Sequence, residues 1–180
     1  VDTIKEKKRR NDFLYSDGNK LKIFLMNVEA FSSVKGKKIA DKFLQLYPAM
    51  FAIDESTTIK NPKAARTKSI MKLGTLARYR RILTGSPVTR SPLDLFSQCY
   101  FLDPKHLQQP SYWSFKNKYC VMETGYAADY TFQKVLGYQR LSDLTGLLNN
   151  FSFRVKKDDC LDLPPKTFVT REVQMNKKQE

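Results

Sequence analysis

Short apolar runs that end abruptly in polar residues mark two stretches of the chain. Ala49–Ile53 is apolar throughout and is followed at once by Asp54-Glu55, while Arg81–Leu83 ends in Thr84-Gly85-Ser86-Pro87. A strand that is covered on both faces, as in a parallel sheet flanked by helices, needs continuous apolarity rather than alternation. The pattern therefore predicts two strands of an α/β fold, each ending in a polar turn.

Apolar residues at helical spacing surround these runs. The stretch from residue 39 to 46 has this spacing and stops before Pro48. Asn61-Pro62 predicts another helix start, with Asn as the N-cap and Pro at the first helical position. In chain order, helices are predicted over residues 39–46, 61–73, 92–101, 112–119 and 142–148, the last capped by Ser142.

The ends of the chain predict further strands. Asp17-Gly18 lies between Phe13–Tyr15 and Leu21–Met26, and this arrangement is typical of a β-hairpin because Asp-Gly supplies the positive φ angles of a tight turn. The charge run before it, residues 5–11, is expected to be a solvated loop or strand edge. Strands are also predicted over residues 151–155 and 168–173, with a rigid linker at 163–166, whereas 123–140 have no clear pattern.

Composition adds a strong positive charge to this picture. The 180 residues include 32 Lys and Arg against 18 Asp and Glu, which gives a formal net charge of +14. A field of this size attracts polyanions, most simply nucleic acid. A face that docks on an acidic partner and a role in solubility are the alternatives that charge alone leaves open.

The cysteines and the hydropathy exclude several classes of protein. Cys99, Cys120 and Cys160 are odd in number and form no CxxC pair, so they argue against a disulfide framework or a zinc site and fit a reducing compartment. No apolar run approaches the ~20 residues of a membrane span, and the N-terminus lacks the pattern of a secretory signal. We therefore expect no membrane partner.

The two strand ends carry the candidate chemistry. In a parallel α/β sheet the carboxyl ends of the strands line the ligand crevice. Paired carboxylates such as Asp54 and Glu55 suit one task there, in which the first holds Mg²⁺ and the second orients a water that attacks a γ-phosphate. Taken alone, Asp54-Glu55 fits equally a strand end with two solvated acids, and Thr84-Gly85-Ser86-Pro87 fits a simple turn. Their order and spacing together make the functional interpretation stronger.

These segments resemble known motifs. Asp54-Glu55-Ser56-Thr57-Thr58-Ile59-Lys60-Asn61 resembles motif II of the Swi/Snf-like ATPases of helicase superfamily two, including its Ile-Lys-Asn tail, and Leu83-Thr84-Gly85-Ser86-Pro87 resembles their motif III. The likeness continues through Pro92–Leu95 and Phe101–Pro104, and Met26–Phe31 resembles a segment of phage and bacterial members. The resemblance covers nearly the whole chain.

The resemblance implies a fold, an activity and partners. The expected fold class is α/β, a partial RecA-like lobe of the P-loop NTPase type with a parallel sheet over residues 1–104, followed by a helical extension over 105–162 and a linker or strand leading toward a second lobe over 163–180. The implied activity is ATP hydrolysis coupled to translocation, remodelling or unwinding of double-stranded DNA. The implied location is the cytoplasm, or the host cytoplasm if a phage encodes the chain.

The resemblance also assigns roles to residues. Asp54 is expected to coordinate Mg²⁺ and Glu55 to activate water, while Thr84, Gly85 and Ser86 couple the nucleotide state to DNA contacts. Thr57 stands where the family usually has His, which leaves a hydroxyl in place of a potential cation in that coupling role.

Basic residues near motif II are candidates for DNA contact. Lys60, Lys63 and Arg66 recur at three-residue spacing and predict a phosphate-binding face at the start of the following helix. A solvated helix face explains the same spacing equally well. Arg90, at a position where the family often has Asn, is expected to contact DNA as well.

The phosphate loop of the family has no counterpart in the sequence. Gly36-Lys37 is the only candidate, but the pattern GxxxxGK[ST] needs Gly where Phe31 stands and Ser or Thr where Lys38 stands. In the family this loop lies well upstream of motif II, and a second lobe supplies an arginine finger. We therefore expect the chain alone to bind ATP poorly and to hydrolyse none.

Two rival interpretations stay open at this stage. One is a catalytically silent, basic DNA-binding or scaffold module that keeps the motor fold without its phosphate loop. The other is a metal-dependent nuclease built on Asp54 and Glu55, which the absence of a third carboxylate or His at useful spacing makes the weaker rival.

Overall fold

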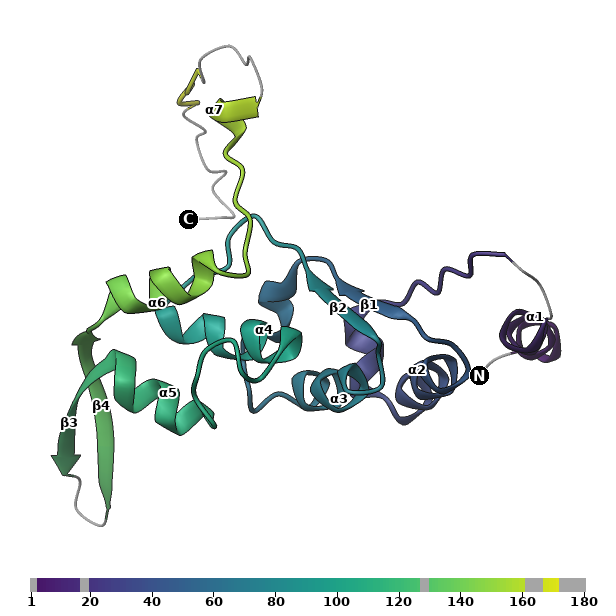
Figure 1. The fold of residues 1–180 in the computed structure, drawn as a ribbon, viewed down its shortest axis with the longest axis horizontal. Helices are drawn as coiled ribbons and strands as arrows, with labels where there is room; N and C mark the ends of the chain where they lie inside the picture. Colours follow the sequence, from purple (N-terminus) through teal and green to yellow (C-terminus); the bar gives the residue numbers. More distant parts are fainter. Residues whose placement is uncertain (1–2, 17–19, 127–129, 161–166, 172–180) are drawn as a thin grey trace, which may run out of the picture.

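The computed structural model describes residues 3–16, 20–126, 130–160 and 167–171. Figure 1 shows a central body with two strands, a β-hairpin that projects from one end, and helix α1 at the other end. The elements are α1 (Ile4–Tyr15), η1 (Val28–Ser32), α2 (Val34–Leu46), β1 (Met50–Ile53), η2 (Ser56–Ile59), α3 (Ala65–Gly74), β2 (Tyr79–Ile82), η3 (Pro92–Asp94), α4 (Leu95–Leu102), α5 (Tyr112–Tyr119), β3 (Cys120–Tyr126), β4 (Thr131–Tyr138), α6 (Leu141–Asn149) and α7 (Lys157–Cys160).

Strands β1 and β2 form the parallel sheet that the apolar runs predict. They pair in register from Met50 opposite Tyr79 to Ile53 opposite Ile82, so both strands end at the same edge. The helix between them, α3, provides the crossover that parallel pairing requires. The mixed α/β class predicted from the sequence is therefore confirmed. The expected cover on both faces of the strands is wrong, because alternate residues of β1 and β2 are exposed.

A first hydrophobic core packs against this sheet. Its buried residues come from η1, α2, β1, η2, α3 and α4, so segments from residue 31 to residue 101 close around one centre. Ile59 and Ile70 are fully buried in it, and Phe51 of β1 meets the edge of Phe101 of α4 at 5.2 Å between ring centroids. These contacts fix the end of β1, where the candidate acids lie.

A second core lies between α4, α5 and α6. Leu95, Phe96 and Cys99 of α4 pack there against Phe115 and Leu144. Since Phe101 at the other end of α4 belongs to the first core, α4 joins the two. Cys99 is a buried core residue, and burial raises the pKa of its thiol to about 12.

The stretch without a clear pattern forms an antiparallel hairpin. Strands β3 and β4 pair from Cys120 opposite Tyr138 to Tyr126 opposite Thr131, with an irregularity between Val121 and Met122. The expected helical extension thus carries a two-stranded sheet in addition to its helices.

The N-terminal expectations were wrong. Residues 5–11 are helical because α1 begins with a complete capping box, in which Thr3 and Glu6 each satisfy a backbone N–H of the other. The predicted hairpin is also absent in the described part, since Phe13–Tyr15 is the last turn of α1 and Leu21–Met26 is extended without a strand partner. The Asp17-Gly18 turn itself lies outside the described residues.

Other boundaries shift by a few residues. Helix α3 begins at Ala65 rather than at Asn61-Pro62, because residues 56–59 first form the 3₁₀ turn η2. Pro92 starts η3 and α4 follows it, while Arg140 rather than Ser142 stands at the N-cap of α6. Residues 151–155 and 167–171 are not strands, and the predicted linker at 163–166 lies outside the described residues.

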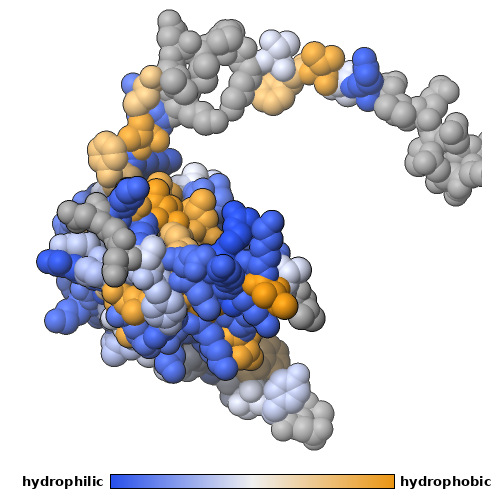
Figure 2. Space-filling model, turned by 90° about the vertical axis from the view of Figure 1, so that its right-hand side faces the viewer, coloured by the Kyte–Doolittle hydropathy of each residue, from blue (hydrophilic) through white to orange (hydrophobic). Residues whose placement is uncertain are grey.

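The face shown in Figure 2 is mainly hydrophilic, with separate hydrophobic patches. Leu21, Ile23 and Leu25 of the extended segment are among the exposed apolar side chains. Within the described part of the chain, every helix is too short or too polar to cross a bilayer.

Candidate functional site

The acidic loop, residues 54–60, begins where β1 ends. Asp54 and Glu55 are both exposed, and the Glu55 backbone N–H donates a hydrogen bond to Asp54 Oδ1 at 2.9 Å. Glu55 has φ 48° and ψ 57°, the left-handed region that residues other than Gly seldom adopt. A strained backbone of this kind persists only when its surroundings hold it in place, and it is frequent at functional sites.

The TGSP turn, residues 84–87, lies at the end of β2 beside the acidic loop. Leu83 N donates to Ile53 O at 2.9 Å, and Ser56 N donates to Leu83 O at 3.0 Å, so the two chain segments remain bonded beyond the strands. The turn itself is closed by a hydrogen bond from Ser86 N to Thr84 Oγ1 at 3.2 Å. The space beside Gly85 is open, since a Cβ built there meets no atom within 4 Å.

Gln98 of α4 connects the acidic loop to the TGSP turn through hydrogen bonds of its side chain. Its side chain is fully buried and accepts a hydrogen bond from Ser56 Oγ at 2.7 Å. Its Nε2 donates to Pro87 O and to Asp94 O, both at 2.8 Å. Because each polar atom of the buried amide has a partner, the network is satisfied and holds both segments in one arrangement.

Asp94 organises the loop that follows the TGSP turn. Its Oδ2 accepts hydrogen bonds from Thr89 N at 3.0 Å, Thr89 Oγ1 at 2.9 Å and Arg90 N at 2.9 Å, and Lys60 Nζ lies 3.9 Å away. Burial alone would raise the pKa of Asp94, but the hydrogen bonds from Arg90 and Thr89 and the charge of Lys60 together lower it. The carboxylate is therefore held in its charged form.

Two of the four basic candidates make contacts within the protein, and the other two are exposed. Lys60 donates to Thr89 Oγ1, and Arg66 donates to Thr58 O at 3.0 Å and pairs with Glu29. Lys63 and Arg90 are exposed. The expected common helix face is wrong, because Lys60 and Lys63 precede the first residue of α3.

The coupling candidates are brought together only in part. Thr84 is half-buried, Gly85 and Ser86 are exposed, and all three lie at the same sheet edge as Asp54. Thr57 is half-buried, yet among the described residues its hydroxyl shows no hydrogen bond to the TGSP turn. Ser56 and Lys60 of the same loop make the connections to the segment after β2 instead.

The residues that connect the two loops escaped the sequence analysis. Gln98 stands in an apolar helix, LFSQCYFL, and this polar residue in an otherwise buried pattern was the available signal. Its partner Ser56 is 42 residues away, a pairing that no local pattern reveals. Glu29, the partner of Arg66, lies 37 residues away and is equally hidden.

Gly36 has a structural role that differs from phosphate binding. A Cβ at this position would lie 2.1 Å from Ala30 O, so glycine allows α2 to pack closely on η1. The Gly36 backbone N–H already donates to the N-cap Ser33 Oγ at 3.0 Å. Gly36-Lys37 therefore belongs to the first turn of α2 and not to a loop that surrounds phosphates.

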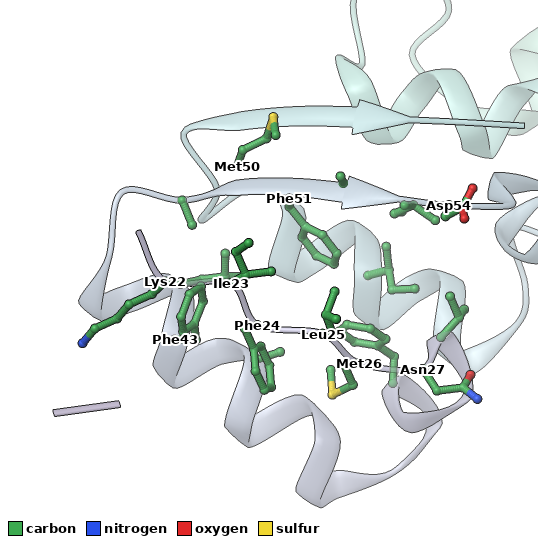
Figure 3. A pocket seen from close by; sticks show the side chains of 18 of the residues that line it. Lys22, Ile23, Phe24, Leu25, Met26, Asn27, Phe43, Met50, Phe51 and Asp54 are labelled. Carbon is green, nitrogen blue, oxygen red and sulfur yellow. The ribbon is translucent and has the colours of Figure 1, made fainter. Parts of the chain in front are cut away.

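A cavity of about 1000 Å³ borders the acidic loop. It lies between residues 20–27, η1, α2 and β1, and it reaches Asp54, Glu55 and Thr58. Figure 3 shows Phe24, Phe43 and Phe51 along its length and Asp54 at the end where β1 finishes. One side of the acidic loop thus faces an apolar hollow and the other faces the TGSP turn.

Parallel strands with polar loops at their carboxyl ends, packed against helices through the first hydrophobic core, fit part of a RecA-like lobe of the P-loop NTPase type. A family comparison makes the assignment specific. The family model described as SNF2-related domain matches residues 2–180, so the chain belongs to the SNF2-related family. Its membership supports the resemblance to Swi/Snf-like helicases.

Individual relatives match at moderate identity. The chain is 34% identical over 116 residues to the Mus musculus protein named DNA annealing helicase and endonuclease ZRANB3. The matched region is 63% of this chain and 11% of that protein. It is 32% identical over 152 residues to a Xenopus tropicalis SWI/SNF-related matrix-associated actin-dependent regulator of chromatin, subfamily A containing DEAD/H box 1, covering 84% of this chain and 14% of the relative. The DNA repair protein RAD5 of Candida glabrata is 28% identical over 131 residues, 71% of this chain and 11% of that protein.

These matches correspond to a small part of each relative, between 11% and 14% of its length. No solved structure matches the chain significantly.

Proposed function

We propose that this chain forms part of a DNA-dependent ATPase that couples ATP hydrolysis to translocation along, or remodelling of, duplex DNA. The observation that carries the proposal is the joining of the acidic loop to the TGSP turn at one sheet edge, through Ser56, Leu83 and Gln98. Family membership and the DNA-related names of the relatives support it.

The side chains at this edge fit Mg²⁺ and a nucleotide phosphate. Asp54 is an exposed carboxylate at a strand end, and Mg²⁺ bound with nucleotides takes one or two carboxylates, waters and phosphate oxygens. When bound, the ion would neutralise charge that develops on the transferred phosphoryl group. Glu55, whose side chain is exposed beside Asp54, would accept a proton from and orient the attacking water.

The segments that bind the β- and γ-phosphates are proposed to lie outside this sequence, because Gly36-Lys37 is used within α2. A phosphate loop and a second RecA-like lobe would complete the site. The isolated chain would accordingly bind ATP weakly and hydrolyse none.

Duplex DNA is the proposed polymeric partner. The net charge of +14 attracts it, and Lys63 and Arg90 are exposed cations close to the acidic loop and the TGSP turn. Lys60 and Arg66 contribute differently, since their internal contacts position the loop that presents Lys63.

The decisive experiment compares ATP turnover of this chain with that of a protein extended through a phosphate loop and a second lobe, each with and without duplex DNA. We expect turnover in the extended protein alone, stimulated by DNA. Glu55→Gln in the extended protein should abolish turnover and leave binding of a fluorescent ATP analogue intact. The isosteric control Asp12→Asn, on an exposed residue of α1, should change neither.

Unchanged turnover in the Glu55→Gln variant would remove Glu55 from the reaction. If the extended protein bound DNA but never hydrolysed ATP, the silent DNA-binding module would replace the motor as the function of this chain.

A further inference from the structure

One edge of strand β1 borders the cavity beside the acidic loop. Among the described residues β1 pairs with β2 alone, so its other edge has no strand partner. Ile53 O accepts a hydrogen bond from Leu83 N at 2.9 Å, which shows that the backbone groups of Ile53 point toward the β2 side. Because these groups alternate in direction along a strand, the N–H and C=O groups of Met50 and Ala52 point away from β2, toward the cavity that both residues line.

An extended segment, residues 21–26, forms the opposite side of the cavity. It runs in the same direction as β1, since its labelled residues and those of β1 follow one another in the same order in Figure 3. Phe24 and Met26 pack against the first hydrophobic core, so this segment belongs to the same body as the sheet. The cavity therefore lies between two extended segments that run in parallel, and within the described part of the chain neither has a strand partner on the cavity side.

The side chains around the cavity are apolar, yet several are exposed to solvent. Leu21 is 88% exposed, Ile23 65%, Leu25 86% and Met50 61%, and all four line the cavity. Parallel sheets are normally covered on both faces, and contiguous exposed apolar surface marks an interaction site. An occupant of this cavity must accordingly be apolar.

The free edge of β1 defines the backbone conformation of that occupant. An unpaired strand edge pairs readily with a further strand, and such pairing combines backbone hydrogen bonds with contacts of alternate side chains. A helix or a lipid chain could cover the apolar side chains, but it would bury the N–H groups of Met50 and Ala52 without acceptors. An extended peptide segment satisfies both the edge and the apolar lining.

We propose that an apolar β-strand of about four to six residues fills the cavity between residues 21–26 and β1 and extends the parallel sheet. The strand is a segment of the same protein outside these 180 residues. This source rests on the proposed function, in which further segments complete the lobe. The regions that match the relatives, 11% to 14% of their length, leave ample chain for it. Since the strand runs parallel to β1, it ends near Asp54 and brings the loop that follows it to the candidate site.

Amide hydrogen exchange tests the pairing. The 180-residue chain is compared with the extended protein, which carries the phosphate loop and the second lobe, both without nucleotide and with fragmentation that resolves single amides. The amides of Met50 and Ala52 should exchange at least about tenfold more slowly in the extended protein. The amides of Phe51 and Ile53 face β2 and should be protected in both proteins.

A charge at the cavity tests whether the protection comes from an apolar occupant. Leu25→Lys in the extended protein should return the exchange of Met50 and Ala52 to within about threefold of the rate in the 180-residue chain, because the lysine would be buried by the strand. The control Ile4→Lys changes a side chain of α1 that is 88% exposed and should leave exchange as in wild type. Both substitutions should preserve the thermal midpoint of the 180-residue chain, since both side chains are exposed there.

Photocrosslinking identifies the source of the strand. The photoreactive residue p-benzoylphenylalanine at position 25 of the purified extended protein should crosslink to a segment of the same molecule outside the 180 residues. A crosslink between two copies, or none, overturns the proposal. Equal exchange of Met50 and Ala52 in the two proteins also overturns it, as does protection that Leu25→Lys leaves intact.

The exchange and ATPase experiments can fail separately. Protection of Met50 and Ala52 without ATP turnover would support the inserted strand and contradict the proposed function. DNA-stimulated turnover without that protection would support the function and contradict the strand.

Discussion

Gln98 is the residue on which the geometry of the candidate site depends most directly. Its amide joins Ser56 of the acidic loop to Pro87 of the TGSP turn within a fully buried environment. A buried polar group that loses its partner retains the cost of leaving water, which is about 1–3 kcal/mol. The side chain thus couples the stability of the protein to the relative position of the two loops.

Replacing Gln98 by Leu should lower the free energy of unfolding by about 2 kcal/mol or more, because Ser56 Oγ and Pro87 O both lose their partner. Urea denaturation measures this change. The matched control is Gln45→Leu, where the exposed amide donates to Asp41 one turn away and the loss should stay below about 0.5 kcal/mol. Equal effects in the two variants would show that the Gln98 network does not hold the loops.

Asp94 gives the same region a dependence on pH. Its folded-state pKa is lowered, so the carboxylate stabilises the fold fully above the ordinary pKa of Asp, about 3.9, and this contribution disappears as the pH falls through the folded-state pKa. The difference in unfolding free energy between wild type and Asp94→Asn should therefore be largest at pH 5–7 and shrink below pH 4.

Chemical denaturation of both proteins between pH 3 and pH 7 measures that difference. Asp12→Asn, on an exposed face of α1, should give a difference close to zero throughout. A difference for Asp94 that stayed constant with pH would mean that its hydrogen bonds do not favour the charged form.

At the scale of elements, close packing of α2 on η1 rests on Gly36. The Cβ of any other residue would overlap Ala30 O, a backbone atom that cannot move without displacing η1. Gly36→Ala should therefore lower the unfolding free energy by about 1–3 kcal/mol, the range for overpacked sites. Gly146→Ala on α6 is the matched control, since open space surrounds that position and alanine should stabilise the helix by about 0.5–1 kcal/mol.

Thermal unfolding of the two alanine variants should move the midpoint in opposite directions. If Gly36→Ala were neutral, α2 and η1 would have to be free to separate, and the cavity between α2 and β1 would not be a fixed feature of the fold.

Local sequence signals predicted some elements and missed others for identifiable reasons. The continuous apolar run before Asp54 and the polar turn after Ile82 were sufficient to predict strands β1 and β2. Helix α5 was predicted over its full length. Helix α1 was missed because the run of charged residues at 5–11 was interpreted as a solvated loop. The Thr3–Glu6 capping box, which is present in the sequence, was the signal for a helix start. Strands β3 and β4 were missed because their pairing depends on cross-strand register rather than on alternation along either strand.

The candidate site was predictable to a similar extent. Asp54, Glu55 and the TGSP turn could be located because each follows an apolar strand. Their internal connections could not, because they depend on residues separated by tens of positions, as Ser56 and Gln98 are. The different surroundings of Lys63 and Arg66 likewise emerge only when η1 is placed beside α3.

For the molecule as a whole, the positive charge has a measurable consequence. Each phosphate that a Lys or Arg neutralises releases counterions, so the logarithm of duplex affinity should fall linearly with the logarithm of salt concentration. With 32 Lys and Arg against 18 Asp and Glu, we expect a steep fall between roughly 50 and 200 mM salt. Affinity that did not respond to salt would exclude a phosphate-based contact.

Single substitutions show which cations make that contact. Lys63→Gln and Arg90→Gln should each lower the slope of the salt dependence by about 1, because each side chain is exposed beside the candidate site and free to meet a phosphate. Lys8→Gln removes the same charge from α1 and should leave the slope unchanged if the duplex lies along the acidic loop and the TGSP turn. Equal slopes for all three variants would mean that DNA is held by the overall charge without a preferred face, and the assignment of Lys63 and Arg90 as DNA contacts would then be wrong.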